Sequence, residues 1–206
     1  MAFILGEKFK MSQRFKDENR IPLTLIKAGP VVVTQLKDEK KDGYKAVQVG
    51  FGGKKKINKP LQGHLKDLGK FRWLREFRVG ENETGKFKVG DKIDVSIFKE
   101  GDLVEVSGIT KGKGFQGVVK RHGFHGGPKT HGQKNRLRAP GSIGSTAMQR
   151  VVKGRRMAGR MGGDRVTVKN LEIITVDPEN NILEVKGAVP GRKGTLLEIR
   201  KIESRK

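Results

Sequence analysis

A stretch of 55 residues, 111–165, carries one acid and little that could form a hydrophobic core. It contains fourteen Lys or Arg residues and thirteen glycines, and its single acid is Asp164. Only eight of its residues are Leu, Ile, Val or Phe, below the roughly 20% under which a highly charged segment buries too little apolar surface to fold alone. A compact domain does not hold a structureless loop of this length unless the loop is functional. We therefore predict that residues 111–165 form an extension that a partner orders.

The charge of the whole chain indicates what that partner is. The formal net charge is +23 over 206 residues, which destabilises a folded domain through self-repulsion. Binding to a polyanion is the simplest explanation for so large a charge. We favour a nucleic acid as that partner over an anionic membrane. The apolar run at 2–5 is too short for a signal peptide, and no run approaches a membrane span. The absence of cysteine excludes disulfides and thiolate metal sites. We expect a cytoplasmic protein without membrane contact.

The flanks of this extension have a different pattern. Apolar and polar residues alternate with the period of a half-buried strand at 93–97, 104–106, 166–168, 173–176 and 182–185. Further strands are expected at 23–27, 31–36, 44–51, 71–79 and 195–202, a hairpin turn at 177–181 and a short helix at 60–68. Many short strands with Gly and Pro turns indicate a β-barrel or sandwich. We predict a mainly β body made of residues 1–110 and 166–206, large enough to fold alone, with 111–165 inserted between its strands.

The glycines at 112, 114 and 117 have the G-x-G-x-x-G spacing of a dinucleotide-binding loop. Such a loop also needs a following helix and an acid about twenty residues later that holds the ribose. Here the next acid is Asp164. A backbone that turns and closely approaches a bulky partner explains these glycines better. We predict no nucleotide cofactor.

Three of the four histidines, His122, His125 and His131, lie close together. Three imidazoles could hold a catalytic zinc, and paired histidines with a lysine could cleave RNA by acid–base catalysis. However, no carboxylate lies nearby to orient the rings, and the surrounding cations disfavour a divalent metal. Beside dense negative charge, histidine donates to phosphate oxygens or stacks on bases. We therefore favour contact with a polyanion and predict no catalytic residue, no metal site and no cofactor.

RNA is favoured over DNA as the polyanion. No helix-turn-helix, zinc finger or heptad basic region is visible, and a long basic arm suits a large folded RNA. The arginines add bidentate phosphate recognition. Phe115 could stack on a base, or it could join a small satellite core against the barrel, the interpretation favoured for Met157. A second basic cluster at 52–56 is expected to touch the same RNA, with a solvated turn as the alternative. The residues predicted to contact RNA are Lys54, Lys55, Lys56, Lys111, Lys113, Phe115, Lys120, Arg121, His122, His125, Lys129, His131, Lys134, Arg136, Arg138, Ser142, Arg150, Lys153, Arg155, Arg156, Arg160 and Arg165.

The chain carries the motif KGKGFQGVVKR at 111–121 and shorter motifs at 4–8, 130–132, 140–144, 153–159, 165–168 and 185–191. In order along the chain, these motifs resemble those of the universal L-three family of large-subunit ribosomal proteins, in its bacterial type. Together they span essentially the whole chain, and several are long and unusual.

The resemblance implies a translation-protein-type β-barrel whose Gly-rich loop approaches the peptidyl-transferase region. Family members bind 23S rRNA near its 3′ end, help to nucleate assembly of the 50S subunit and neighbour the L-fourteen and L-nineteen proteins. None is an enzyme, and no homo-oligomer is implied. By position, residues 111–121 would form a stem on rRNA. The loop tip would comprise Gly144, Ser145, Thr146, Ala147, Met148 and Gln149.

The tip departs from the family pattern in one respect. Some bacterial members carry an N-methylated glutamine shortly after the motif at 140–144. This chain is one residue shorter there, so Ala147 falls nearest to the modified position and Gln149 is not its clear equivalent. The resemblance therefore implies no modified residue in this chain.

Overall fold

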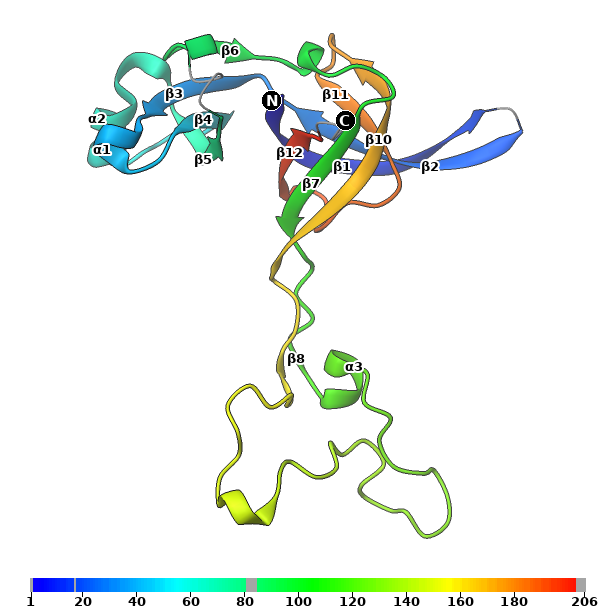
Figure 1. Ribbon diagram of the computed structural model, residues 1–206. Coiled ribbons are helices and arrows are strands. Elements are labelled where there is room, and N and C mark those ends of the chain that lie inside the picture. Colours follow the sequence, from blue (N-terminus) through cyan, green and yellow to red (C-terminus); the bar gives the residue numbers. More distant parts are fainter. Residues whose placement is uncertain (1, 17, 81–84, 203–206) are drawn as a thin grey trace. The chain divides into compact units, whose positions relative to one another are not determined.

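The computed structural model describes residues 2–16, 18–80 and 85–202 (Figure 1). The strands are β1 (Phe3–Lys16), β2 (Asn19–Ala28), β3 (Val31–Lys37), β4 (Ala46–Gly53), β5 (Phe71–Arg78), β6 (Lys92–Ile93), β7 (Leu103–Ile109), β8 (Phe115–Gln116), β9 (Gly159–Arg160), β10 (Arg165–Asp177), β11 (Ile182–Lys186) and β12 (Leu196–Lys201). The α-helices are α1 (Glu39–Asp42), α2 (Lys59–Leu65) and α3 (Val118–His122), and the 3₁₀ turns are η1 (Lys66–Leu68), η3 (Val95–Ile97) and η4 (Thr146–Met148).

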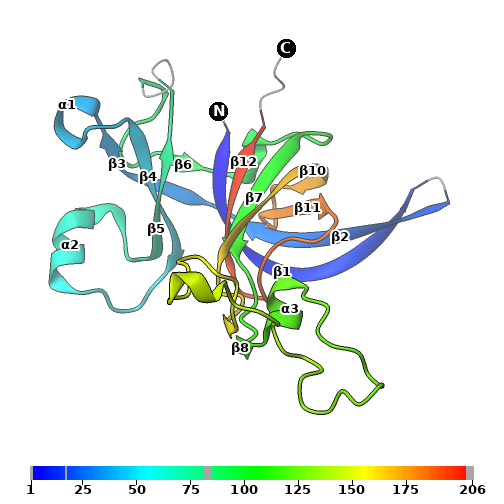
Figure 2. The same cartoon turned by 60° about the horizontal axis from the view of Figure 1, so that its bottom comes forward.

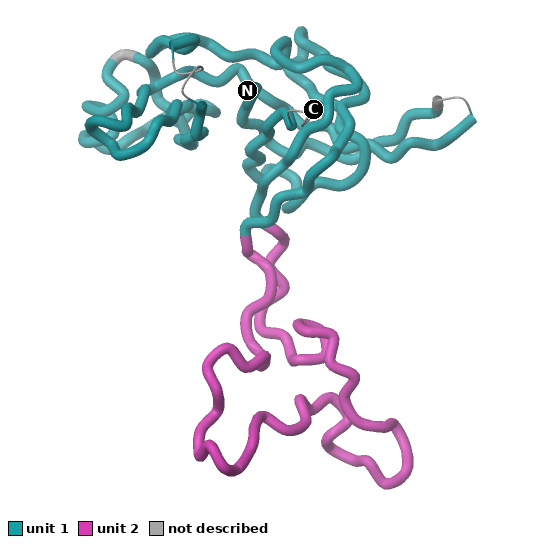
Figure 3. Tube along the Cα trace, viewed as in Figure 1, with its two compact units in different colours: residues 1–109, 165–206 teal, residues 110–164 magenta. Residues whose placement is uncertain are grey.

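The chain divides into two compact units, Met1–Ile109 with Arg165–Lys206, and Thr110–Asp164 (Figure 3). We call them the barrel unit and the basic unit. In sequence, the basic unit follows β7 and precedes β10.

A closed β-barrel forms the larger part of the barrel unit, with the strand order β1-β12-β7-β10-β11-β2. Its antiparallel register places Ile4 opposite Ile199, and Ile199 opposite Val106. All three side chains are fully buried, so one row of β-branched residues crosses the barrel. The prediction of a mainly β fold with a barrel is confirmed.

A second sheet, in the order β5-β4-β3-β6, packs against the barrel and shares its core. Phe3 on β1 stacks on Phe77 of β5 with ring centroids 4.4 Å apart. This packing explains why the consecutive residues Phe3 to Leu5 of β1 are all buried. One face of the strand belongs to the barrel core, and the other face packs against the second sheet. Both views show α1 and α2 beside this sheet, away from the barrel (Figures 1 and 2).

A polar network connects three segments of the second sheet. The Lys37 ammonium donates to the Tyr44 hydroxyl, 2.9 Å away, and the hydroxyl donates to Glu76 at 2.7 Å. Burial alone would raise the pKa of the Glu76 carboxyl, but the hydrogen bonds from Tyr44, Lys37 and Gln48 outweigh it and lower that pKa. The hydrogen bonds of the Lys37 ammonium to Tyr44 and Glu76 raise the pKa of Lys37. Both groups are therefore charged at neutral pH.

The expected strand at 93–97 is wrong, because only Lys92–Ile93 is extended and Val95–Ile97 forms a 3₁₀ turn. The Phe98 N–H donates to the Val95 carbonyl over 3.1 Å. This turn brings two apolar side chains three positions apart into the core, with Val95 fully buried and Phe98 3% exposed. In a strand the two residues would point to opposite faces.

The other expected elements are present, with one extension. The expected helix at 60–68 is seen as α2 and η1, and the hairpin turn lies between β10 and β11. The two alternating stretches at 166–168 and 173–176 belong to one long strand, β10, whose register shifts between Val168 and Leu171. No helix in the described part of the chain is both long enough and apolar enough to cross a bilayer.

Candidate nucleic-acid interface

Two antiparallel segments form the base of the basic unit. The Lys113 N–H donates to the Met161 carbonyl over 2.9 Å, and the Met161 N–H donates to Gly114 over 3.0 Å. The ladder continues as β8 and β9. Gly162 lies on this base with φ +74°, and a Cβ there would overlap the carbonyl oxygen of Lys111. The close approach therefore requires glycine on steric grounds.

Helix α3 is fastened to the returning segment by two predicted RNA-contact residues. The Arg121 guanidinium donates to the Met157 carbonyl over 2.8 Å, and Nε2 of His122 lies 3.1 Å from the same oxygen. A carbonyl oxygen accepts only, so the proton of His122 is on Nε2 in this contact. A Cβ on Gly159 would collide with Arg121. Arg121 and His122 thus hold the unit's own backbone together.

A second contact fixes the loop that precedes the tip. The Arg155 guanidinium donates to the carbonyl oxygen of Ser142, and the Ser142 hydroxyl donates to the Gly144 carbonyl over 3.1 Å. At the tip, η4 is capped by the Ser145 hydroxyl, which accepts from the Ala147 N–H. The predicted tip residues therefore form a short, hydrogen-bonded turn.

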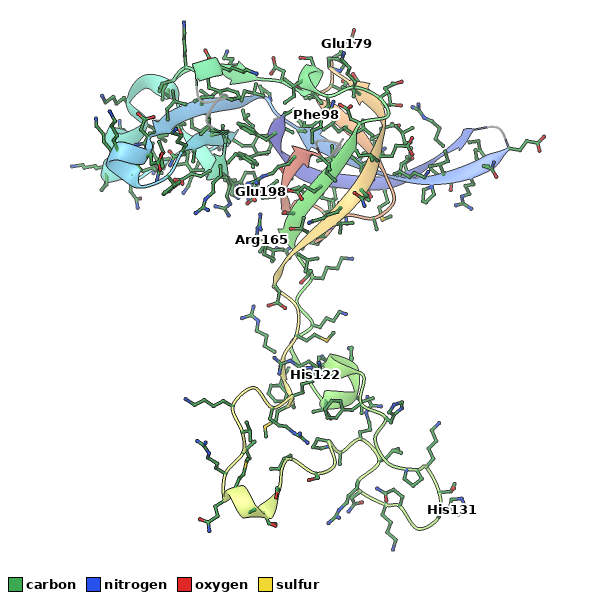
Figure 4. The ribbon with its side chains drawn as sticks, viewed as in Figure 1. Phe98, His122, His131, Arg165, Glu179 and Glu198 are labelled. Atoms are coloured by element: carbon green, nitrogen blue, oxygen red, sulfur yellow. The ribbon has the colours of Figure 1, made fainter. Side chains whose placement is uncertain are left out.

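The predicted contact residues of the basic unit other than Arg121 and His122 are exposed. Phe115 is 76% exposed, which leaves its ring available for stacking. His122 and His131 lie apart, His122 on α3 and His131 on the following loop (Figure 4), and no group of three potential metal ligands occurs among the described residues. The exposed residues are Lys111, Lys113, Phe115, Lys120, His125, Lys129, His131, Lys134, Arg136, Arg138, Ser142, Arg150, Lys153, Arg155, Arg156 and Arg160.

Arg165 lies outside the basic unit, at the first position of β10. Its guanidinium is 2.6 Å from Oε2 of Glu198 on β12 (Figure 4). Nε of Arg75 is 3.2 Å from Oε1 of the same carboxylate. In the sequence of β5, Arg75 interrupts a series of alternating apolar residues. In the structure Arg75 is a partner of Glu198, so the barrel and the second sheet are joined by one carboxylate.

The second basic cluster, Lys54 to Lys56, is exposed and directly follows β4. The Lys54 N–H donates to the Lys70 carbonyl over 2.9 Å, which places this loop beside the start of β5. There the Arg72 guanidinium lies 4.2 Å from the centre of the Trp73 ring. Sequence reasoning missed Lys70 and Arg72 as neighbours of the cluster, because only strand pairing brings the two segments together.

The sequence of this chain is similar to those of known proteins. The sequence profile of the family described as Ribosomal protein L3 matches residues 83–180. A large ribosomal subunit protein uL3 from Dehalococcoides mccartyi is 50% identical over 200 residues, covering 96% of this chain and 97% of its own. Proteins of the same name are 53% identical in Herpetosiphon aurantiacus, over 95% and 94% of the two chains, and 52% identical in Chlorobaculum tepidum, over 97% and 98%. The chain therefore belongs to the ribosomal protein L3 family.

Proposed function

We propose that this protein is a structural constituent of the large ribosomal subunit that binds 23S rRNA, chiefly through residues 110–164. The relatives are named as large-subunit proteins, and the family is one of structural proteins rather than enzymes. The observation that carries the proposal is the uncompensated charge of the basic unit. Among the described residues, no Lys or Arg of this unit forms an ion pair with a carboxylate.

The mechanism divides binding between the two units. The barrel unit has a continuous hydrophobic core and supplies a rigid anchor. The basic unit has a short ladder at its base and, beyond it, helix α3 and turns that are held by few hydrogen bonds, so ordering it on RNA costs backbone entropy of about 1–2 kcal/mol per residue. Phosphate contacts and the release of counterions offset that cost.

The resemblance of the motifs makes the proposal more specific. The protein would bind near the 3′ end of 23S rRNA, early enough to help nucleate assembly of the 50S subunit in the cytoplasm. Its tip, the turn around η4, would approach the peptidyl-transferase region. Its protein neighbours would be the L-fourteen and L-nineteen proteins, and the cluster at 54–56 would touch the same RNA.

Footprinting of the full chain on naked large-subunit rRNA tests the proposal. One reproducible protected region towards the 3′ end supports it, and the log of the affinity should fall linearly with the log of salt, with a slope of about −0.7 to −0.9 per phosphate neutralised. Scattered protection, or equally tight binding of duplex DNA at matched salt, would indicate a general polyanion binder instead. Cleavage of the RNA that disappears with His131→Ala would point to a ribonuclease.

A further inference from the structure

The basic unit contains a mainly apolar pocket whose lining includes only one of the predicted RNA-contact residues, Arg138. Three separate segments line it: Val118 at the start of α3, the loop that carries Arg138, Pro140 and Ile143, and Met157 on the returning segment. Its volume is about 360 Å³, within the range of pockets that hold small molecules. Val118 is 4% exposed, whereas Ile143 and Met157 are 43% and 36% exposed. The floor is therefore packed and the walls are open to an occupant.

The walls of this pocket are held in place by specific hydrogen bonds. Arg121 and His122 both donate to the Met157 carbonyl, which fixes the returning segment to α3. Arg155 donates to the Ser142 carbonyl, which fixes the same returning segment to the loop of Ile143. All three lining segments are thus tied together by side chains whose charge also suits phosphate.

The composition of the surroundings selects the class of occupant. An apolar occupant alone would need no positive rim, yet Arg138 lines this pocket, and the sequence from 106 to 163 holds no acid. A nucleobase combines an apolar face with an attached phosphate. Unpaired bases of folded RNA are splayed out and stack on apolar side chains or on guanidinium planes. A protein segment that matched this rim would instead have to present acids.

We propose that an unpaired nucleobase of the large-subunit rRNA inserts into this pocket, against Ile143 and Met157, with Arg138 beside its phosphate or stacked on its face. The proposal rests on the proposed rRNA binding and adds a site that reads a single exposed base. It gives the basic unit a point of registration on the RNA, which cations that contact the phosphate backbone do not supply by themselves.

The test compares pocket-filling variants of the full chain on naked large-subunit rRNA by chemical probing of base and ribose reactivity. Ile143→Trp and Ala158→Trp each fill the pocket from a different lining segment without changing charge. Val152→Trp is the matched control, because Val152 is 52% exposed in the same unit and does not line the pocket.

We expect one nucleotide within the footprint to change reactivity when the wild-type chain or Val152→Trp binds, and to keep its free reactivity with both pocket variants. Their affinity should fall roughly tenfold, the scale of one lost stacked base, with an unchanged salt slope. An intact footprint with identical reactivities for all four proteins would overturn the pocket but leave the proposed function standing. No defined footprint for the wild type would overturn both. Normal binding by the pocket variants to naked rRNA, with a defect only when other ribosomal proteins are present, would assign the pocket to a protein and also overturn the inference.

Discussion

At the scale of single residues, the cations of the basic unit fall into two groups. Arg121 and Arg155 donate to backbone carbonyls of their own unit, so they shape the surface as well as charging it. Arg156 and Lys153 are exposed, and no hydrogen bond from either side chain is found in the described part of the chain. Residue type and charge predict both groups as RNA contacts. Only the structure distinguishes the cations that also hold the backbone in place from those that do not.

This division predicts different salt responses for two neighbouring arginines. Arg156→Ala should reduce the magnitude of the slope of log affinity against log salt by about 0.7–0.9, one phosphate contact. Arg155→Ala should weaken rRNA binding at every salt concentration, because it also releases the Ser142 backbone. Filter binding over a salt series measures both. An unchanged slope in the double variant would contradict the assignment of these residues to phosphate contacts.

A second prediction concerns the carboxylate that joins Arg75 and Arg165. Glu198→Gln should lower the free energy of unfolding by about 1 kcal/mol, since both ion pairs lose their charge and both guanidinium groups are about half exposed. Urea denaturation measures the change. Glu172→Gln is the control, because both side chains of the ion pair between Glu172 and Lys186 are exposed. Equal losses of unfolding free energy in the two variants would show that the position of Glu198 between two sheets adds nothing to stability.

At the scale of elements, alternation of apolar residues located most strands, and its failures have physical causes. At 93–97 the alternating pattern does not form a strand, because a 3₁₀ turn at Val95–Ile97 allows both Val95 and Phe98 to be buried in the core. The strand β1 gives no clean alternation, since its first residues are buried on both sides and its later ones, such as Phe15, are 67% exposed. The pocket in the basic unit could not be predicted, because hydrogen bonds to backbone carbonyls assemble it from distant segments.

The base of the basic unit offers a test at this scale. Gly162→Ala places a Cβ against the Lys111 carbonyl at a positive φ, so strain of about 1–3 kcal/mol should separate the two segments and weaken rRNA binding about tenfold or more. The barrel's unfolding midpoint should not change. Gly154→Ala is the control, with φ +83° but no atom within 4 Å of the added Cβ. If both variants bind equally well, the close approach at Gly162 does not matter.

At the scale of the whole molecule, the structure combines a barrel unit that has a packed core with a basic unit in which, among the described residues, only Val118 is a buried hydrophobic side chain. The carboxylates of the barrel unit take part in its stability. Burial would raise the pKa of the Asp102 carboxyl, but the Lys201 ammonium, 2.6 Å away, and the Lys99 N–H outweigh burial and lower it. The Asn180 side chain and backbone lower the pKa of Asp177. At Glu76, the hydrogen bonds of the second sheet outweigh burial and lower the pKa of the carboxyl.

These shifts predict how the stability of the barrel depends on pH. Because the folded pKa values lie below the unfolded values of about 4, the stabilisation is complete above that range and is lost as pH falls through the folded values. The Tm should therefore be nearly constant from about pH 7 to pH 5 and fall steeply below about pH 4. Asp102→Asn should lower the Tm at pH 7 and flatten the acid limb. A Tm that is flat down to pH 3, or an acid limb that is unaltered in Asp102→Asn, would contradict this account.

Amide hydrogen exchange on the full chain, free and bound to large-subunit rRNA, tests most directly whether RNA orders the basic unit. We expect the barrel strands to exchange slowly in both states. Residues 110–164 should exchange orders of magnitude faster than the barrel strands when free, since their hydrogen bonds beyond the base are few and exposed, and should slow on rRNA. Exchange at 110–164 that is already as slow as in the barrel strands of the free protein, or that stays fast on rRNA, would contradict it.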